Sequence, residues 1–274
     1  MLDVMAQAEN AIEAYNQALQ ASSANIANMN VTGYKKINVS FQSIFEKILN
    51  GGSAATSANG GTNPEQLGQG MAISQTSVDF SNGQTTSGGS LDLAIQGSGL
   101  FIVSPDGGNS FLYTRAGNFS IDSNGNLTSN NMQVYGLDSA GNLVAINNLP
   151  SGNKSNFQWL ADGTLQFTAD PSATTVNWIN TGYSIALTYF TNPGGLAQAQ
   201  GTTFAATLAS GAAAAAQGPG GSVGTVLPKQ LEQSNVFFLG ESVASRELQR
   251  AISANLSVVK LASDTISSVI QKLG

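Results

Sequence analysis

The chain has 274 residues, a formal net charge of −6 and only 9% charged side chains, against roughly a quarter in an average soluble domain. It contains no Cys and no His, which excludes disulfides, thiolate chemistry, the usual zinc ligands and the commonest general base. An acidic chain without clustered Lys and Arg is not expected to bind nucleic acid.

Residues 1–34 predict a long N-terminal helix with a seven-residue apolar repeat. One register holds Met5, Ile12, Leu19 and Ile26, which is the seam pattern of a coiled coil. Gly33 is expected to end the helix. Positions off the seam are mostly small and neutral, which favours contact with other helices over a solvated face. The alternative is an amphipathic helix packed on a local core.

The chain start lacks the basic and apolar segments of a signal peptide, and no apolar run is long enough to span a membrane. Residues 35–75 are expected to be a linker. Its centre, residues 50–70, is rich in Gly, Ser, Ala and Asn and lacks periodicity, which favours an extended or flexible segment.

Residues 76–228 predict an antiparallel β domain. Short alternating apolar segments are separated by tight-turn signals at Asn124-Gly125, Ala140-Gly141-Asn142 and Asp162-Gly163. Strands at this spacing are typical of all-β architectures.

Residues 229–274 predict a second helix with the same seven-residue repeat. Leu248, Ile252, Val259 and Ile266 belong to its seam, and Asn255 is a polar exception that could set the register. We therefore predict an α+β fold, in which the N- and C-terminal helices form a coiled-coil pair around a central antiparallel all-β domain.

Titratable residues are scattered and give no catalytic pattern. Asp92, Asp122 and Asp162 stand alone in strands or turns, so we predict no catalytic, cofactor-binding or metal-binding residues and no enzyme. Arg115 is noted because aromatic residues flank it. It is either a surface arginine with a packed stem, or part of an ion pair between domains or subunits.

Three segments resemble the signatures of bacterial flagellar rod and hook proteins. Residues 22–36, "SSANIANMNVTGYKK", are similar to the N-terminal signature, although Ala24 and Tyr34 depart from it. "SLDLAIQGSGLFIV" and "YTRAGNFSIDSNGNL" resemble the core of the β domain, and "LEQSNVFF" and "LQRAISANLSVV" resemble the C-terminal signature, with Phe237-Phe238 as a departure. The matching residues at the two ends are Asn25, Ile26, Ala27, Asn28, Thr32, Gly33, Lys35, Ser234, Asn235, Val236, Gln249, Arg250 and Asn255.

The resemblance implies a structural subunit of the flagellar axial polymer, with the terminal helices in an inner coiled-coil tube and the β domain outside. It implies no cofactor, no membrane insertion, and partners that are copies of itself, adjacent axial proteins (rod, hook–filament junction and hook cap) and the flagellar type III export apparatus. The predicted polymer contacts are Met5, Ile12, Leu19, Ile26, Asn25, Asn28, Leu248, Ile252, Asn255, Val259 and Ile266.

The sequence favours a hook subunit, because the segment around residues 50–70 looks most like the linker of short hook proteins. A hook is the extracellular universal joint that transmits motor torque to the filament. The alternative is the distal rod protein of the periplasmic basal body, which the chain length suits. A second alternative is a secreted adhesin-like β module with oligomerising helices, for which Trp159 and Trp178 would line an exposed groove.

Overall fold

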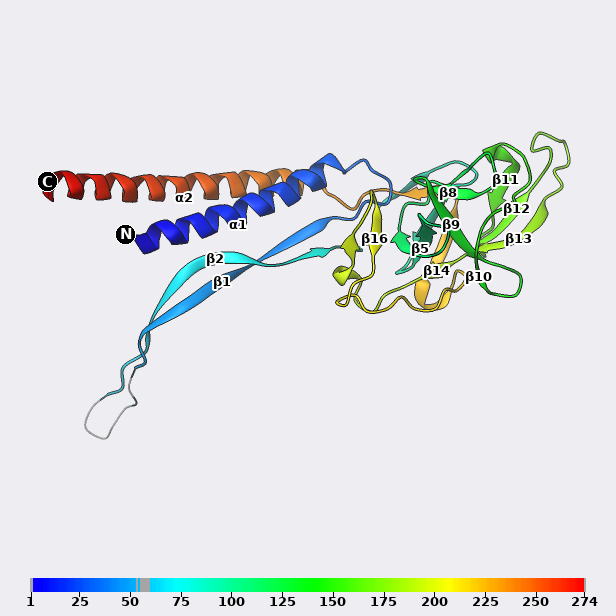
Figure 1. Ribbon diagram of the computed structural model, residues 1–274. Helices are drawn as coiled ribbons and strands as arrows, with labels where there is room; N and C mark the ends of the chain where they lie inside the picture. Colours follow the sequence, from blue (N-terminus) through cyan, green and yellow to red (C-terminus); the bar gives the residue numbers. More distant parts are fainter. Residues whose placement is uncertain (1, 53, 55–59, 274) are drawn as a thin grey trace. The chain divides into compact units, whose positions relative to one another are not determined.

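The computed structural model describes residues 2–52, 54 and 60–273 (Figure 1). The chain divides into two compact units, which are described separately. The helical unit comprises Met1–Ile26, Ile37–Thr76 and Phe238–Gly274, and the β unit comprises Ala27–Lys36 and Ser77–Phe237. The helical unit is therefore assembled from three separate stretches of the sequence.

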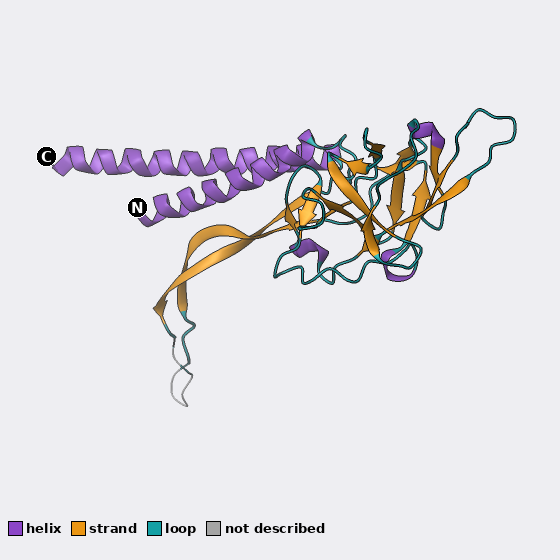
Figure 2. Ribbon diagram, turned by 45° about the vertical axis from the view of Figure 1, so that its right-hand side comes forward, coloured by secondary structure: helices purple, strands orange, loops and turns teal. Residues whose placement is uncertain are grey.

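Two long helices, α1 (Leu2–Ala27) and α2 (Phe238–Leu273), lie side by side in the helical unit and run in opposite directions (Figures 1 and 2). Small alanines along α1 allow this close approach, and the Ser22 hydroxyl near the end of α1 donates to the Glu241 carboxylate near the start of α2 at 2.8 Å. The predicted pairing of the terminal helices is confirmed. The helices begin and end inside the predicted ranges, because residues 28–36 and 229–237 adopt turns and strands.

The prediction of a linker over residues 35–75 is wrong for most of its length. Strands β1 (Ile37–Asn50) and β2 (Glu65–Val78) pair to form a two-stranded hairpin (Figure 2). Both flanks alternate apolar and polar residues, as in Val39-Ser40-Phe41, and this period of two favours a strand. The low-complexity composition that suggested a linker describes only the connecting segment, in which residues 53 and 55–59 lie outside the described residues.

The β unit confirms the predicted antiparallel architecture. Within the described part of the chain, its main sheet has twelve strands with the central order β11-β12-β13-β9-β5-β6-β16-β15. Two further pairs, β17 with β4 and β18 with β3, join the C-terminal end of the unit to its beginning. The strands are β3 (Thr85–Ser87), β4 (Leu93–Gln96), β5 (Leu100–Ser104), β6 (Leu112–Thr114), β7 (Ser120–Ile121), β8 (Leu127–Ser129), β9 (Met132–Leu137), β10 (Leu143–Ala145), β11 (Phe157–Trp159), β12 (Thr164–Phe167), β13 (Ile179–Ile185), β14 (Leu187–Thr188), β15 (Ala197–Gln198), β16 (Thr203–Ala205), β17 (Thr225–Pro228) and β18 (Gln230–Glu232).

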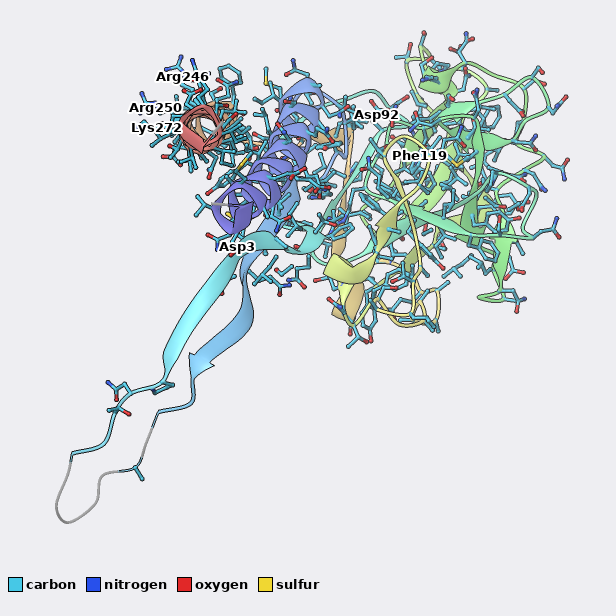
Figure 3. The ribbon with its side chains drawn as sticks, turned by 60° about the vertical axis from the view of Figure 1, so that its left-hand side comes forward. Asp3, Asp92, Phe119, Arg246, Arg250 and Lys272 are labelled. Carbon is cyan, nitrogen blue, oxygen red and sulfur yellow. The ribbon has the colours of Figure 1, made fainter. Side chains whose placement is uncertain are left out.

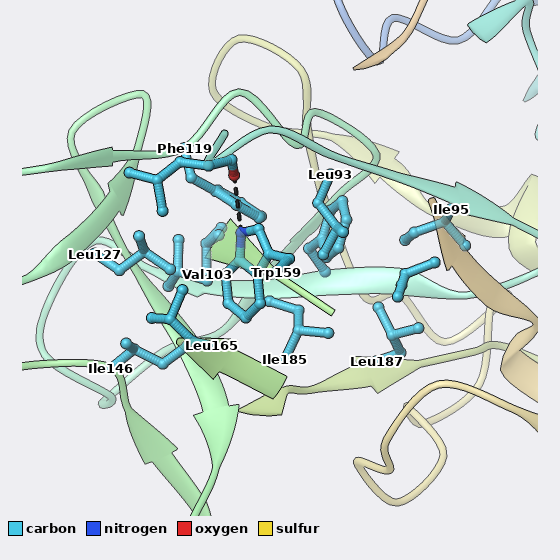
Figure 4. Packing of buried hydrophobic residues seen from close by; sticks show 14 of the residues in the cluster. Leu93, Ile95, Val103, Phe119, Leu127, Ile146, Trp159, Leu165, Ile185 and Leu187 are labelled. Carbon is cyan, nitrogen blue, oxygen red and sulfur yellow. Dashed lines mark hydrogen bonds between the residues drawn. The ribbon is translucent and has the colours of Figure 1, made fainter. Parts of the chain in front are cut away.

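The core of the β unit is built from large apolar side chains (Figure 4). Trp159 is 3% exposed, and its indole N–H donates to the Leu91 carbonyl oxygen at 2.8 Å. Its ring meets Phe119 edge to face. Trp159 therefore belongs to the core and does not line an exposed groove, which contradicts its role in the adhesin hypothesis, while Trp178 is partly exposed.

Candidate assembly surfaces

The face of α1 that is buried within the chain consists of small residues. Ala8, Ala11, Ala14 and Ala18 are each at most 8% exposed. The predicted seam residues of α1 lie beside this face, and each is only partly buried: Met5, Ile12, Leu19 and Ile26. Contacts within the chain therefore bury the small residues of α1 and leave the larger apolar side chains partly exposed to solvent.

Helix α2 shows the same incomplete burial. Its 36 residues outrun the 26 residues of α1, so its C-terminal part extends past the start of α1 (Figure 1). In this part Ile270 is 64% exposed. The predicted seam residues of α2 are all partly exposed: Leu248, Ile252, Val259 and Ile266. Apolar surface on this scale indicates a contact with another protein.

Asn25, predicted as a polymer contact, is used inside the chain. Its side chain is 1% exposed, and its amide exchanges two hydrogen bonds of 2.9 Å with the backbone of Ile37 at the start of β1. The same amide donates to the Glu241 carboxylate at 3.3 Å. The amide thus joins α1 to β1 and α2, so its buried side chain is not available to a neighbouring subunit.

The other two predicted asparagines differ from Asn25. Asn255 is partly exposed and donates to the Ala251 carbonyl oxygen of its own helix at 2.9 Å. It also borders a groove of about 370 Å³ in the helical unit, together with Ala8, Tyr15 and Met71. Asn28 is partly exposed just after α1, where its carbonyl oxygen accepts the Val31 N–H at 3.1 Å.

Arg115 is neither a surface residue nor a contact between units. Its side chain is 1% exposed and lies within the β unit, where it pairs with the Glu232 carboxylate at 3.2 Å. The second carboxylate oxygen of Glu232 binds Lys35 at 2.6 Å and accepts the Gly83 N–H at 2.9 Å. We call Lys35, Arg115 and Glu232 the ion cluster. Its cations come from the N-terminal and central signature segments, and its anion comes from the C-terminal one.

Burial dominates the electrostatics of the ion cluster. Removal from water lowers the pKa of both Lys35 and Arg115, and the Glu232 carboxylate opposes this effect. Arg115 also donates to backbone carbonyl oxygens of Ile95 and Gly97. One carboxylate faces two buried cations, so these carbonyl dipoles supply part of the compensation that Glu232 alone cannot.

Backbone contacts bring the same segments together around the ion cluster. Gly33 donates its N–H to the Glu232 carbonyl oxygen at 2.8 Å, and the Asn235 side chain accepts the Lys36 N–H at 2.8 Å. Gly33 has a φ of +69°, and a Cβ there would collide with the backbone of Ala116. Gly33 was predicted as a helix stop, but α1 ends at Ala27 and Gly33 serves this close approach instead.

An uncharged surface on the β unit was not found by sequence reasoning. No charged side chain occurs between Asp170 and Lys229. Within this stretch the Leu208 side chain is fully exposed on a short loop. Hydrogen bonds from the Thr207 hydroxyl to Gly195 at 2.6 Å and from the Ser210 hydroxyl to Thr207 at 2.9 Å hold that loop. This stretch therefore presents Leu208 on an uncharged surface, and the absence of charged residues in the sequence is the signal that could have found it.

The described residues offer no chemical site of another kind. None of the helices in this part of the chain is long and apolar enough to cross a membrane. Across the same residues, no group of three or more acidic side chains is placed to hold a metal ion.

Comparison with known proteins identifies the family. Residues 94–166 match the family described as "Flagellar hook protein FlgE/F/G D1 domain". The chain is 33% identical to the flagellar basal-body rod protein FlgG of Bacillus subtilis over 90% of this chain and 89% of that protein. It is 30% identical to FlgG of Caulobacter vibrioides over 92% of both chains. It is 40% identical to the flagellar hook protein FlgE of Borreliella burgdorferi, but over only 41% of this chain and 26% of that protein.

The match to the Bacillus subtilis rod protein spans nine-tenths of the chain and nearly the same share of that protein. A relationship of this extent at 33% identity shows membership of the same family. The chain belongs to the flagellar hook and rod family of non-enzymatic axial structural proteins.

Proposed function

We propose that the protein is the distal rod subunit of the flagellar basal body, located in the periplasm. The observation that supports this proposal is the extent of the matches. Rod proteins align with about nine-tenths of this chain and of their own length, whereas the hook protein of Borreliella burgdorferi aligns over about a quarter of its length. A hook subunit would be expected to share more of the hook proteins' length.

This proposal replaces the preference for a hook that the sequence suggested. That preference rested on reading residues 50–70 as a hook-type linker, but Asn50 belongs to β1 and residues 65–70 belong to its partner strand β2. The family assignment, together with the buried position of Trp159, also replaces the adhesin hypothesis.

In the proposed mechanism, copies of the chain polymerise through the helical unit into a tube that transmits torque. The partly exposed seam residues, such as Ile26 and Ile252, would be covered by neighbouring subunits, at a gain of about 25 cal/mol per Å² of apolar surface. The two-stranded hairpin has no further strand at either edge among the described residues, and such a hairpin is marginal alone. Neighbouring subunits would supply the missing contacts.

The same proposal assigns the other partners. The subunit would contact adjacent axial proteins at the two ends of its segment, including other rod proteins, and would leave the cytoplasm through the flagellar type III export apparatus. The hook–filament junction and hook cap proteins, expected from the sequence for a hook subunit, would not be direct neighbours of a distal rod.

Deleting the gene and imaging the basal bodies by electron microscopy tests the proposal. If the chain forms the distal rod, the deletion strain should carry shortened rods without hooks. A copy with a peptide tag in the exposed loop at Gly141, restored to this strain, should place tag density on the straight rod. Full-length rods in the deletion strain, or tag density on the curved hook, would overturn it.

A further inference from the structure

The two helices carry charge pairs of opposite sign at matching spacing. Helix α1 bears Asp3, Glu9 and Glu13 and no basic residue, whereas the first half of α2 bears Arg246 and Arg250 together with Glu241 and Glu247. The side chains of Glu9, Glu13, Arg246 and Arg250 are all exposed. In a chain with so few charges, two like-charged pairs four residues apart are not explained by ordinary surface composition.

Each pair is exposed on the side of its helix away from the other helix, and Glu13 also lines a groove of about 260 Å³ with Ile44 and Ile73 of the β1–β2 hairpin. At 3.6 residues per turn, Glu9 and Glu13 fall roughly opposite the buried alanines Ala11 and Ala18 of α1. Figure 3 places Arg246 and Arg250 on the side of α2 that faces away from α1. Within one chain the acidic and basic pairs therefore point away from each other.

Neither pair is neutralised inside the chain. In the described part of the chain, none of these four side chains forms an ion pair within 4.0 Å. Like charges four residues apart destabilise a helix by a few tenths of a kcal/mol, about 0.2–0.5 per pair. The acidic pair thus carries a cost in the single chain that an opposite charge from outside would remove, whereas Glu247, three residues before Arg250, offsets part of the cost of the arginine pair.

We infer that the Glu9/Glu13 pair of one subunit binds the Arg246/Arg250 pair of a neighbouring copy and sets the axial register of the helices. This inference rests on the proposed polymer of identical subunits. Residues four apart are separated by about 6 Å along a helix, so both ion pairs form in one register. Arginine forms two parallel hydrogen bonds with a carboxylate, which adds geometric specificity. Val243 and Leu261, exposed on the same face of α2, add apolar contact at either side.

Charge reversal tests the contact in cells that lack the native gene. Glu9→Lys with Glu13→Lys, or Arg246→Glu with Arg250→Glu, should each lower the protein recovered in basal bodies by roughly tenfold, because two attractions become repulsions. Combining all four substitutions should restore recovery to within about twofold of wild type, since the pairs are re-formed with exchanged signs. The matched control is Lys260→Glu with Asp264→Lys, which exchanges a pair elsewhere on α2 and should assemble normally.

Cross-linking gives a readout that does not depend on tolerance of reversed charges. The chain contains no cysteine, so Glu13→Cys and Arg250→Cys variants, co-expressed and treated with a short bis-maleimide, report only on these positions. Dimers should appear in basal bodies only when both variants are present, and not when Lys260→Cys replaces Arg250→Cys.

Four results would overturn the inference. Reversed pairs that assemble like wild type, or a fourfold variant no better than the separate reversals, would show that the charges do not pair. Rods that contain the protein but yield no dimer would do the same while leaving the proposed function intact. Absence of the wild-type protein from any axial polymer would overturn both.

Discussion

At the scale of single residues, the ion cluster is the feature with the largest energetic consequence. Lys35 and Arg115 are buried cations that share one carboxylate, Glu232. Breaking a buried pair by removing one partner is strongly destabilising, because the remaining charge stays buried and uncompensated. The cluster also holds the segment after α1 and the segment before α2 on one β unit.

We predict that removing the anion of the ion cluster destabilises the β unit more than removing one of its cations. Glu232→Gln leaves two buried cations facing each other and should lower the free energy of unfolding of the β unit by about 3–5 kcal/mol. Lys35→Met leaves Glu232 paired with Arg115 and should cost no more than about 1–2 kcal/mol. Urea unfolding followed by tryptophan fluorescence measures both, and equal losses would contradict the account.

The turn aspartates predict a pH dependence. Donation by the Ser110 hydroxyl, its backbone N–H and the Ser104 hydroxyl lowers the pKa of Asp106 from 3.8 to about 2. Backbone and side-chain N–H groups of Asn126 and Asn142 lower the pKa of Asp122 and Asp138.

A carboxyl group whose pKa is lower in the folded than in the unfolded state stabilises the fold at any pH above its unfolded-state pKa. That stabilisation is lost as the pH falls from the unfolded-state pKa through the folded-state pKa. The β unit should therefore lose stability between pH 3.8 and about 2. A variant with Asn at positions 106, 122 and 138 should show a flatter profile over this range. A slope as steep as that of wild type would show that other groups are responsible.

At the scale of elements, the helices are the part of the chain with the least burial. Within the helical unit, all buried apolar side chains among the described residues are alanines: Ala8, Ala11, Ala14, Ala18 and Ala262. An alanine contributes little apolar area, so the pairing of α1 with α2 relies on Ser22, Asn25 and Glu241 as well. The larger side chains remain available for neighbours.

We predict that Ile252→Asp, and equally Ile26→Asp, abolishes assembly and leaves the β unit folded. A carboxylate at a partly exposed position is tolerated in the single chain but costs on the order of 1–3 kcal/mol or more when a neighbour removes it from water. Ile252→Leu is the matched control and should assemble. The measurements are recovery in basal bodies and tryptophan fluorescence of the purified chain. Normal rods from either Asp variant would contradict the proposal that these seam residues contact neighbouring subunits.

At the scale of the whole molecule, the two units differ in how they are stabilised. The large buried aromatic and aliphatic side chains, including Phe101, Phe119 and Phe157, belong to the β unit. Both tryptophans also belong to it, so fluorescence reports on the β unit and far-ultraviolet circular dichroism at 222 nm reports mainly on the helices.

The purified monomer should therefore unfold in two steps. Ellipticity at 222 nm should fall at a lower urea concentration than tryptophan fluorescence, because the helical unit buries little apolar surface. Assembled rods should keep their helical signal to a higher concentration. A single coincident transition of the monomer would mean that the two units form one cooperative fold.

Much of the architecture could be predicted from the sequence because its signals are local. A seven-residue repeat marks a helix within the segment that forms it, and Asn124-Gly125 marks a turn from two adjacent residues. The paired terminal helices, the antiparallel β unit and the family signatures were all available in this way. The linker prediction failed because composition was given more weight than the alternation of Val39 and Phe41.

The roles of individual site residues could not be predicted, because they depend on contacts between distant segments. Asn25 and Arg115 gave no local sign that each would be buried and bonded inside the chain. Lys35 meets Glu232 across a separation of 197 residues, and Arg115 meets it across 117. The sequence by itself determined which segments are helix, strand and turn, because those choices follow from neighbouring residues. Only the tertiary structure decided which side chains face inward and which remain for a partner, because burial depends on the packing of the whole chain.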